Sequence, residues 1–283
     1  MKTKLLGLAR YIGRKTLPVS LRRKIWTTFL GRYFDRSSVK AIVAYAEVNK
    51  GEQSAGVMRL INVLKTNNCR PDYELISNEI GLHFKGFSCQ DLIAYIYFNG
   101  KKSGFFIDIG AYDGVAISNT FFLEQLGWKG ICVEPIPEIY SLLQKNRDCY
   151  KYNAAISSTT DSGAPFLKVS NLAGLSGLES QMPDRIRKGL EKQGLDIEKI
   201  VVNTLSFDDV MKNHPQISYI DFLSIDVEGG ELDVLKTIDF GRFRFGLVTI
   251  ENNAGTGQLR NYMLQNGYNI LFDLGVDLMF VPG

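Results

Sequence analysis

The residues best suited to chemistry stand where apolar runs end in glycines and acids. The run GFFIDIGAYDG at 104–114 is an apolar strand pattern that enters a glycine turn, with Asp108 and Asp113 beside the glycines. Twenty residues further on, the run GICVEP ends a second apolar pattern on Glu134. A glycine turn lets the backbone pass close to a ligand, and an acid on the next strand accepts hydrogen bonds from ribose hydroxyls. The pair indicates a site for an adenosine-containing cofactor.

The turn differs from the G-x-G-x-x-G motif of dinucleotide-binding proteins, because Tyr112 stands two residues after Gly110. Close approach of a pyrophosphate is harder without that second glycine. An NAD-dependent oxidoreductase is the alternative enzyme, and it is further disfavoured because no catalytic Tyr-Lys or histidine pairing occurs at a recognisable spacing. Of the two histidines, His214 fits a solvated polar loop and His83 is a candidate base.

Two later strand patterns also end on acids. The run YIDFLSID leads directly into Asp226 and, two residues on, Glu228, and the run VTIENN ends on Glu251 and Asn252. Ligands of open α/β sheets bind at the carboxyl ends of the strands, so we expect at least one of these acids to be functional. The alternative for Glu228 is structural, because an acid is favourable at a helix N-terminus.

Charge is distributed unevenly along the 283 residues. Residues 1–40 hold 11 Lys and Arg and one acid, which leaves 22 basic and 29 acidic residues in the rest of the chain. We expect residues 1–75 to form a basic helical segment and residues 76–283 to form the main domain. The segment 1–40 fits either a solvated helix pair or a peripheral contact with an anionic membrane or an acidic partner. Nucleic acid is disfavoured, because no recognition motif accompanies the charge.

Composition favours an ordered globular protein, since 45% of the residues are hydrophobic. The sequence offers no continuous apolar run of the roughly 18–20 residues that a membrane span requires. Its four cysteines lack metal-like spacing. These observations predict a cytoplasmic protein, with a membrane-peripheral position as the alternative.

Strand and helix patterns alternate through most of the main domain, which predicts a parallel sheet covered on both faces. The strand patterns lie at 104–109, 129–134, 150–156, 219–226 and 245–251, and the helical ones at 89–98, 115–126, 137–147, from 230, and at 256–266. Two closing strands, YNILFDL and DLMFVP, are joined by only Gly275 and Val276, which predicts an antiparallel hairpin. The polar stretch 157–218 interrupts the alternation and is typical of a lid or acceptor-binding insertion.

Taken together, FFIDIGAYDG, SNT at 118–120, GWKGICVEP and LSIDVEGGELDVLK resemble the FkbM family of S-adenosylmethionine-dependent methyltransferases. The run SCQD at 88–91 is similar to an S-x-x-G-Q-D element of that family, with Cys89 where glycine is usual. The resemblance covers about residues 85–283. It implies an α/β fold, the Rossmann-like class I methyltransferase sheet of seven mostly parallel strands with the last one antiparallel.

The same resemblance implies O-methylation of a sugar or glycan hydroxyl, as in polysaccharide biosynthesis, with S-adenosylmethionine as the methyl donor. O-methylation of a polyketide-type natural product is an alternative within the family. A non-catalytic, membrane-docked adaptor that keeps the fold is the alternative from a different class, and the retained acids Asp108 and Glu134 argue against it.

Twelve positions are assigned to cofactor binding by the resemblance: Gln90, Asp91, Asp108, Gly110, Ala111, Asp113, Gly114, Asn119, Glu134, Pro135, Ala155 and Ile156. Within this set Glu134 would hold the ribose, and Ala155 and Ile156 would flank the adenine. Gln90 and Asp91 would close over the methionine end.

Methyl transfer to a neutral hydroxyl needs an in-line approach and a group that takes up or offsets the hydroxyl proton. We therefore expect the catalytic residues to be Asp226, Glu228 and Glu251. The strand-end acids also resemble the carboxylate and amide arrangement of metal-dependent catechol-type methyltransferases, which implies a Mg²⁺ site at Asp226, Glu251 and Asn252. The alternatives are a direct base without metal, or a cofactor-orienting role for Asp226 or Glu228.

Overall fold

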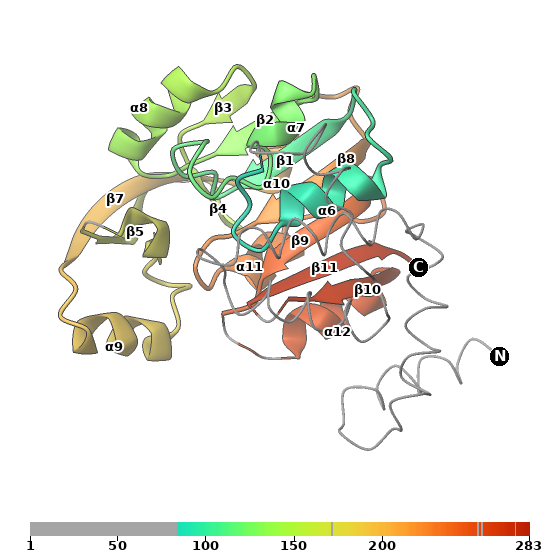
Figure 1. The fold of residues 1–283 in the computed structure, drawn as a ribbon. Coiled ribbons are helices and arrows are strands. Elements are labelled where there is room, and N and C mark those ends of the chain that lie inside the picture. The colour runs from blue at the N-terminus through green and yellow to red at the C-terminus, as the bar shows by residue number, and fades with distance from the viewer. Residues whose placement is uncertain (1–83, 171, 254, 256, 275) are drawn as a thin grey trace. The chain divides into compact units, whose positions relative to one another are not determined.

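The computed structural model describes residues 84–283 except 171, 254, 256 and 275 (Figure 1). The basic helical segment predicted at 1–75, its boundary with the main domain and His83 lie outside the described residues. Within the described part of the chain, no helix is long and apolar enough to cross a membrane.

A seven-stranded sheet with β1 near its middle organises the described residues. In spatial order its strands are β10 (Tyr268–Asp273), β11 (Asp277–Pro282), β9 (Arg244–Glu251), β8 (Tyr219–Ile225), β1 (Phe105–Ile109), β2 (Lys129–Val133) and β3 (Tyr150–Tyr152). Strands β9, β8, β1, β2 and β3 pair in parallel, whereas β11 is antiparallel to both β9 and β10. The predicted mostly parallel sheet, its closing hairpin and its antiparallel last strand are confirmed.

The central strands are largely apolar because side chains on both faces are covered. Every residue of β8 after Tyr219 is buried, and Phe222, Phe245 and Phe280 are fully enclosed between sheet and helices. Such continuous burial is typical of parallel strands with helices on both faces. The helices that alternate with these strands are α6 (Gln90–Tyr97), α7 (Phe121–Gln125), α8 (Pro137–Asn146), α11 (Glu231–Lys236) and α12 (Gln258–Gln265).

Two predicted elements are wrong in their extent. The helix predicted at 115–126 begins only at Phe121, because Ile117 has a φ of 50°, outside the helical region. The strand predicted at 150–156 is two strands, β3 and the short β4 (Ala155–Ile156), which belong to different sheets.

A second, four-stranded sheet occupies much of the stretch that the sequence pattern left unassigned (Figure 1). Its order is β4, β7 (Ile197–Leu205), β5 (Asp161–Val169) and β6 (Gly177–Leu178), and the same stretch holds η3 (Ala173–Leu175), α9 (Asp184–Lys192) and α10 (Phe207–Met211). Strand β5 contains Gly163 and Pro165 and is exposed over its first half, so it lacks the period of a half-buried strand. A small core that includes Phe166, Leu178 and Val202 holds this sheet together.

Candidate functional site

A cavity lies at the carboxyl ends of β1, β2 and β8, where ligands of open α/β sheets bind. Eight of the twelve positions assigned to the cofactor line it: Asp108, Gly110, Ala111, Asn119, Glu134, Pro135, Ala155 and Ile156. Asp226, from the end of β8, lines the same cavity. Eight of the positions assigned to the cofactor and one predicted catalytic acid thus line a single cavity, and their roles stay predictions.

The second sheet supplies part of the cavity wall, which the sequence did not predict. Phe166 of β5, Leu178 of β6 and Ser176, which directly precedes β6, all line the cavity. Their only sequence signal was their place in the stretch 157–218, which was predicted to be an insertion near the acceptor.

Gly110 is required at the turn after β1 by a close backbone approach. Its φ is +87°, and a Cβ there would lie 1.7 Å from the carbonyl oxygen of Asp226. The N–H of Asp226 donates to the carbonyl of Ile109 (2.9 Å), so the ends of β1 and β8 are held against one another. This contact fixes the distance between the glycine turn and the acids that follow β8.

The Glu134 carboxylate is held in place by two backbone N–H groups. Its carboxylate accepts hydrogen bonds from the N–H groups of Tyr112 (3.1 Å) and Ile136 (2.9 Å). Burial raises the pKa of Glu134 to about 7, and the two backbone donors oppose that shift. A fixed carboxylate beside the apolar Pro135 and Ala155 fits an adenosine moiety, with its ribose at the acid.

Asp108 is linked to a buried arginine that the sequence did not single out. The Thr120 hydroxyl donates to Asp108 Oδ2 (2.6 Å), and Arg147 Nη2 donates to Thr120 Oγ1 (3.1 Å). Arg147 also donates to the Gly114 carbonyl (2.9 Å) and forms an ion pair with Glu124. Burial raises the pKa of Asp108, whereas the Thr120 hydrogen bond and the Arg147 charge lower it. Arg147 therefore braces the whole loop from 110 to 120.

The remaining four assigned positions, Gln90, Asp91, Asp113 and Gly114, are not among the cavity-lining residues. Asp91 accepts from the N–H groups of Lys85 and Gly86, and Gln90 Oε1 accepts from the N–H of Ser88. Asp113 Oδ1 accepts from the two N–H groups that follow Gly114, each at 2.8 Å. These side chains shape the loops around the cavity, and their direct contact with a cofactor stays a prediction.

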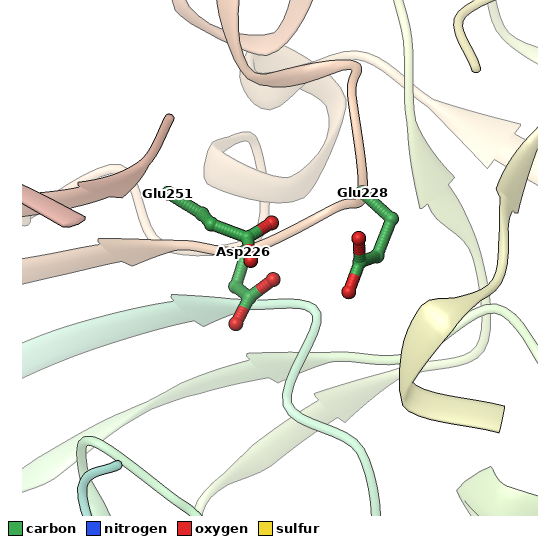
Figure 2. A group of neighbouring side chains, drawn as sticks. All are labelled: Asp226, Glu228 and Glu251. Atoms are coloured by element: carbon green, nitrogen blue, oxygen red, sulfur yellow. The ribbon is translucent and has the colours of Figure 1, made fainter. Parts of the chain in front are cut away.

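The three predicted catalytic acids form one cluster. One carboxylate oxygen each of Asp226, Glu228 and Glu251 lies within 4.8 Å of the others. Figure 2 shows the three side chains converging from the turn after β8 and the end of β9. Burial raises the pKa of each of the three acids above its ordinary range; the charge of Asp226 adds to this effect at Glu228 and Glu251, and the charge of Asp277 adds to it at Asp226. The cluster consequently retains at least one proton near neutral pH.

Asn253, and not the predicted Asn252, joins two of these acids. Its Nδ2 donates to Glu228 Oε2 and to Glu251 Oε2, both at 2.7 Å. The side-chain oxygen of Asn252 has no hydrogen-bond partner in the described part of the chain. The sequence ENN does not show which of the two asparagines faces the acids. The strand ends at Glu251, and beyond it the side chains no longer alternate between the two faces of the sheet. The Mg²⁺ role of Asn252 stays a prediction.

The second sheet also reaches the turn that carries Glu228. A Cβ on Gly230 would lie 2.2 Å from Gln181 Oε1, and a Cβ on Gly177 would lie 3.2 Å from the Val227 carbonyl. Arg185 of α9 donates to the carbonyl of Asn253 (2.6 Å). Residues 177–185 thus contact the turn that carries Glu228 and the loop that carries Asn253.

The donor set of the acidic cluster fits a hard divalent cation, because such ions prefer several carboxylate oxygens. Asn253 already fixes the orientation of two of the acids. Asp226, Glu228 and Glu251 would be the residues that hold such an ion.

The large sheet and the cavity at its carboxyl edge define the described residues as a methyltransferase fold. The model of the methyltransferase FkbM domain matches residues 108–270, which is more than half of the chain. The chain belongs to the FkbM methyltransferase family, and the resemblance noted in the sequence is confirmed. A search of curated proteins found no match.

Proposed function

We propose that the chain is an S-adenosylmethionine-dependent O-methyltransferase that acts on a hydroxyl of a sugar or glycan. The observation that carries this proposal is that one cavity is lined both by Glu134, which suits a ribose, and by Asp226, which belongs to the acidic cluster. A donor and an acceptor bound at these two places would meet within the same cavity. Sugar hydroxyls are hydrogen-bond donors, which suits a cluster composed of acceptors.

When bound, S-adenosylmethionine supplies an electrophilic methyl group on a sulfonium. Asp226 is positioned to accept the acceptor's proton as the new O–C bond forms and the C–S bond breaks. Burial raises the pKa of Asp226, the charges of Asp277, Glu231 and Asp108 add to this effect, and a hydrogen bond with Glu251 opposes it. A carboxylate with a raised pKa is the better base for a neutral hydroxyl.

The first test is ligand binding followed by mutation. We expect calorimetry to detect S-adenosylhomocysteine and to give no heat with NAD. Asp226→Asn and Glu251→Gln should each lower kcat by about 100-fold or more, since general-base catalysis contributes about 10²–10⁴. Binding of S-adenosylhomocysteine should be retained in both variants. Full activity of both would remove the acidic cluster from the mechanism, and binding of neither ligand by the wild type would favour the adaptor.

A second test separates a direct base from a Mg²⁺ site. If the cluster holds Mg²⁺, EDTA abolishes turnover and added Mg²⁺ restores it, and calorimetry with Mg²⁺ alone gives a signal that is lost in Glu228→Gln. Turnover that is unchanged by EDTA assigns the cluster to proton transfer without metal. An acceptor panel of glycans and polyketide-type phenols decides between the two substrate classes.

The peripheral contact of residues 1–40 is a separate part of the proposal, supported by their 11 basic residues and one acid. Sedimentation with anionic vesicles should depend on these residues and weaken as salt is raised. Neutral vesicles provide the control.

A further inference from the structure

Two cysteines that take no part in the proposed reaction lie side by side at the edge strand β3. Cys132 is fully buried in β2, and Cys149, which directly precedes β3, is partly exposed. Their Sγ atoms are 3.5 Å apart, a hydrogen-bonding distance for sulfur. The sulfurs of a disulfide are about 2.05 Å apart, so a shift of roughly 1.5 Å would bring the pair to bonding distance. The two thiols can therefore be joined by oxidation after a small movement.

The surroundings favour a reactive Cys149 and an inert Cys132. The hydrogen bond with Cys132 is the largest cause that lowers the pKa of Cys149. The charges of Arg147 and Lys151 lower it further, while burial and the charge of Glu124 oppose the shift. Burial raises the pKa of Cys132 well above its ordinary value. Because the thiolate is the form that attacks an oxidant, Cys149 has both the access and the charge environment of the attacking thiol.

We propose that Cys149 and Cys132 form a reversible disulfide when the protein meets hydrogen peroxide. In the first step the Cys149 thiolate forms an S–O bond with the peroxide, the O–O bond breaks, and hydroxide leaves and takes up a proton from solvent. In the second step Cys132 Sγ attacks this sulfenic sulfur, the S–S bond forms, the S–O bond breaks, and hydroxide leaves with the Cys132 proton as water. The two thiols lose two electrons and one peroxide becomes two waters. An external dithiol restores both thiols by exchange.

The disulfide acts on the loop after β1 through Glu124. Cys132 is fixed because β2 pairs with a strand on each side, so Cys149 must make most of the movement. The Cys149 N–H donates to Glu124 Oε1 (2.7 Å), and Glu124 is the ion-pair partner of Arg147. Arg147 in turn donates to the Gly114 carbonyl (2.9 Å). Oxidation therefore loosens the contacts that brace the loop, which makes the pair a redox switch.

Peptide mapping of the full chain tests the disulfide directly. Trypsin cuts after Lys145 and Arg147, which places the two cysteines on separate peptides. We expect hydrogen peroxide to link these two peptides and dithiothreitol to separate them again. Absence of the link after complete reaction of the partly exposed thiol would overturn the proposal. A link of either cysteine to Cys69 or Cys89 in its place would also overturn it.

Two serine variants assign the roles of the thiols. In Cys132→Ser, Cys149 should stop at the sulfenic acid, which dimedone traps. In Cys149→Ser, Cys132 should stay unmodified under the same peroxide treatment, because it is buried. Trapping of Cys132 in Cys149→Ser to the extent seen for Cys149 would contradict the assigned roles. The peptide map of the wild type decides the disulfide itself even where a variant fails to fold.

Hydrogen exchange measures the effect on the loop. In the oxidised protein, amide exchange in residues 110–120 should be faster by about tenfold or more, the effect of losing hydrogen bonds to charged groups. Cys149→Ser treated with the same peroxide is the matched control and should show no change. Unchanged exchange in fully linked wild type would overturn the switch.

Calorimetry adds a readout that rests on the proposed function. The oxidised wild type should bind S-adenosylhomocysteine more weakly than the reduced wild type, and peroxide-treated Cys149→Ser should bind it as before. Equal binding by the oxidised and reduced wild type would show that the switch does not reach the cofactor. If the reduced wild type binds no S-adenosylhomocysteine, the proposed function fails, whereas the peptide map and the exchange rates still decide the redox switch.

Discussion

At the scale of single residues, the acidic cluster is notable because the folded protein buries several carboxyl groups that resist ionisation. Burial is the main cause of the raised pKa of Glu228, which reaches about 8, and the charge of Asp226 adds to it. Because the folded protein holds this proton more tightly than the unfolded chain, ionisation of Glu228 opposes folding. The contribution is absent below the ordinary glutamate pKa and grows as pH rises toward the folded value.

Glu228→Gln should therefore stabilise the protein more at high pH than at low pH. We expect its gain in the free energy of unfolding over the wild type to be larger at pH 8 than at pH 5 by roughly 3–4 kcal/mol. Urea unfolding at both pH values measures the difference. Glu191→Gln, which changes an exposed glutamate of α9 in the same way, is the control. A pH-independent effect of Glu228→Gln would contradict the raised pKa.

At the scale of elements, the end of α8 and the loop after β1 are joined through one arginine. Arg147 directly follows α8, and its side chain is almost wholly buried against the loop that carries Asp108, Gly114 and Thr120. Removal of its charge would leave Glu124, whose side chain is 11% exposed, without its ion-pair partner.

Arg147→Met should consequently lower the free energy of unfolding by roughly 3–5 kcal/mol, the range for breaking a buried ion pair. It should also weaken the binding of S-adenosylhomocysteine, because the loop after β1 loses its hydrogen bonds with Arg147. Denaturant unfolding and calorimetry measure the two effects. Arg242→Met removes a half-exposed arginine that pairs with Asp208 and should change stability by less than about 0.5 kcal/mol. Equal effects of both variants would argue against a special role for Arg147.

The strands and helices also show how much of the fold could be predicted from the sequence. The large sheet was predictable because β1, β2, β8 and β9 are short apolar runs that end on acids or glycines, a pattern that depends only on local burial. The division of 150–156 into β3 and β4 could not be predicted. The two strands pair in different sheets, but this difference in pairing partner leaves no trace in the pattern of side chains. The extent of α7 depended on the left-handed conformation of Ile117, which is uncommon for a β-branched residue.

The candidate site was predictable in the same measure. Asp108, Glu134 and Asp226 stand at strand ends and could be located from their position. The roles of Thr120, Arg147, Asn253 and Gln181 depend on contacts between distant segments, to which spacing along the chain gives no access. No local signal marks a residue that acts by holding another residue in place.

At the scale of the whole molecule, the cavity connects the two sheets. Its lining comes from the carboxyl ends of β1, β2 and β8 in the large sheet and also from Phe166 and Leu178 of the second sheet. A ligand that fills the cavity must therefore contact both sheets, and its binding should stabilise them together.

Hydrogen exchange measures this coupling. Saturating S-adenosylhomocysteine should slow amide exchange in residues 110–119 and 133–136, and also in 173–181 of the second sheet, by up to about 100-fold at 100 times the dissociation constant. Residues 258–265 of α12 do not line the cavity and serve as the internal control. Protection confined to the large sheet would show that the second sheet does not share in cofactor binding.

Because β1 lies between β2 and β8 in the sheet, it cannot complete its pairing until β8 has been synthesised. The N–H of Phe105 donates to the carboxylate of Asp221 (2.9 Å), which lies 116 residues further along the chain. At a translation rate of about 5–20 residues per second, β1 waits roughly 6–23 seconds for the strand that completes its pairing. Through that interval its outer edge is an open template for other nascent chains. The late pairing of β1 with β8 therefore makes the half-synthesised chain a substrate for chaperones.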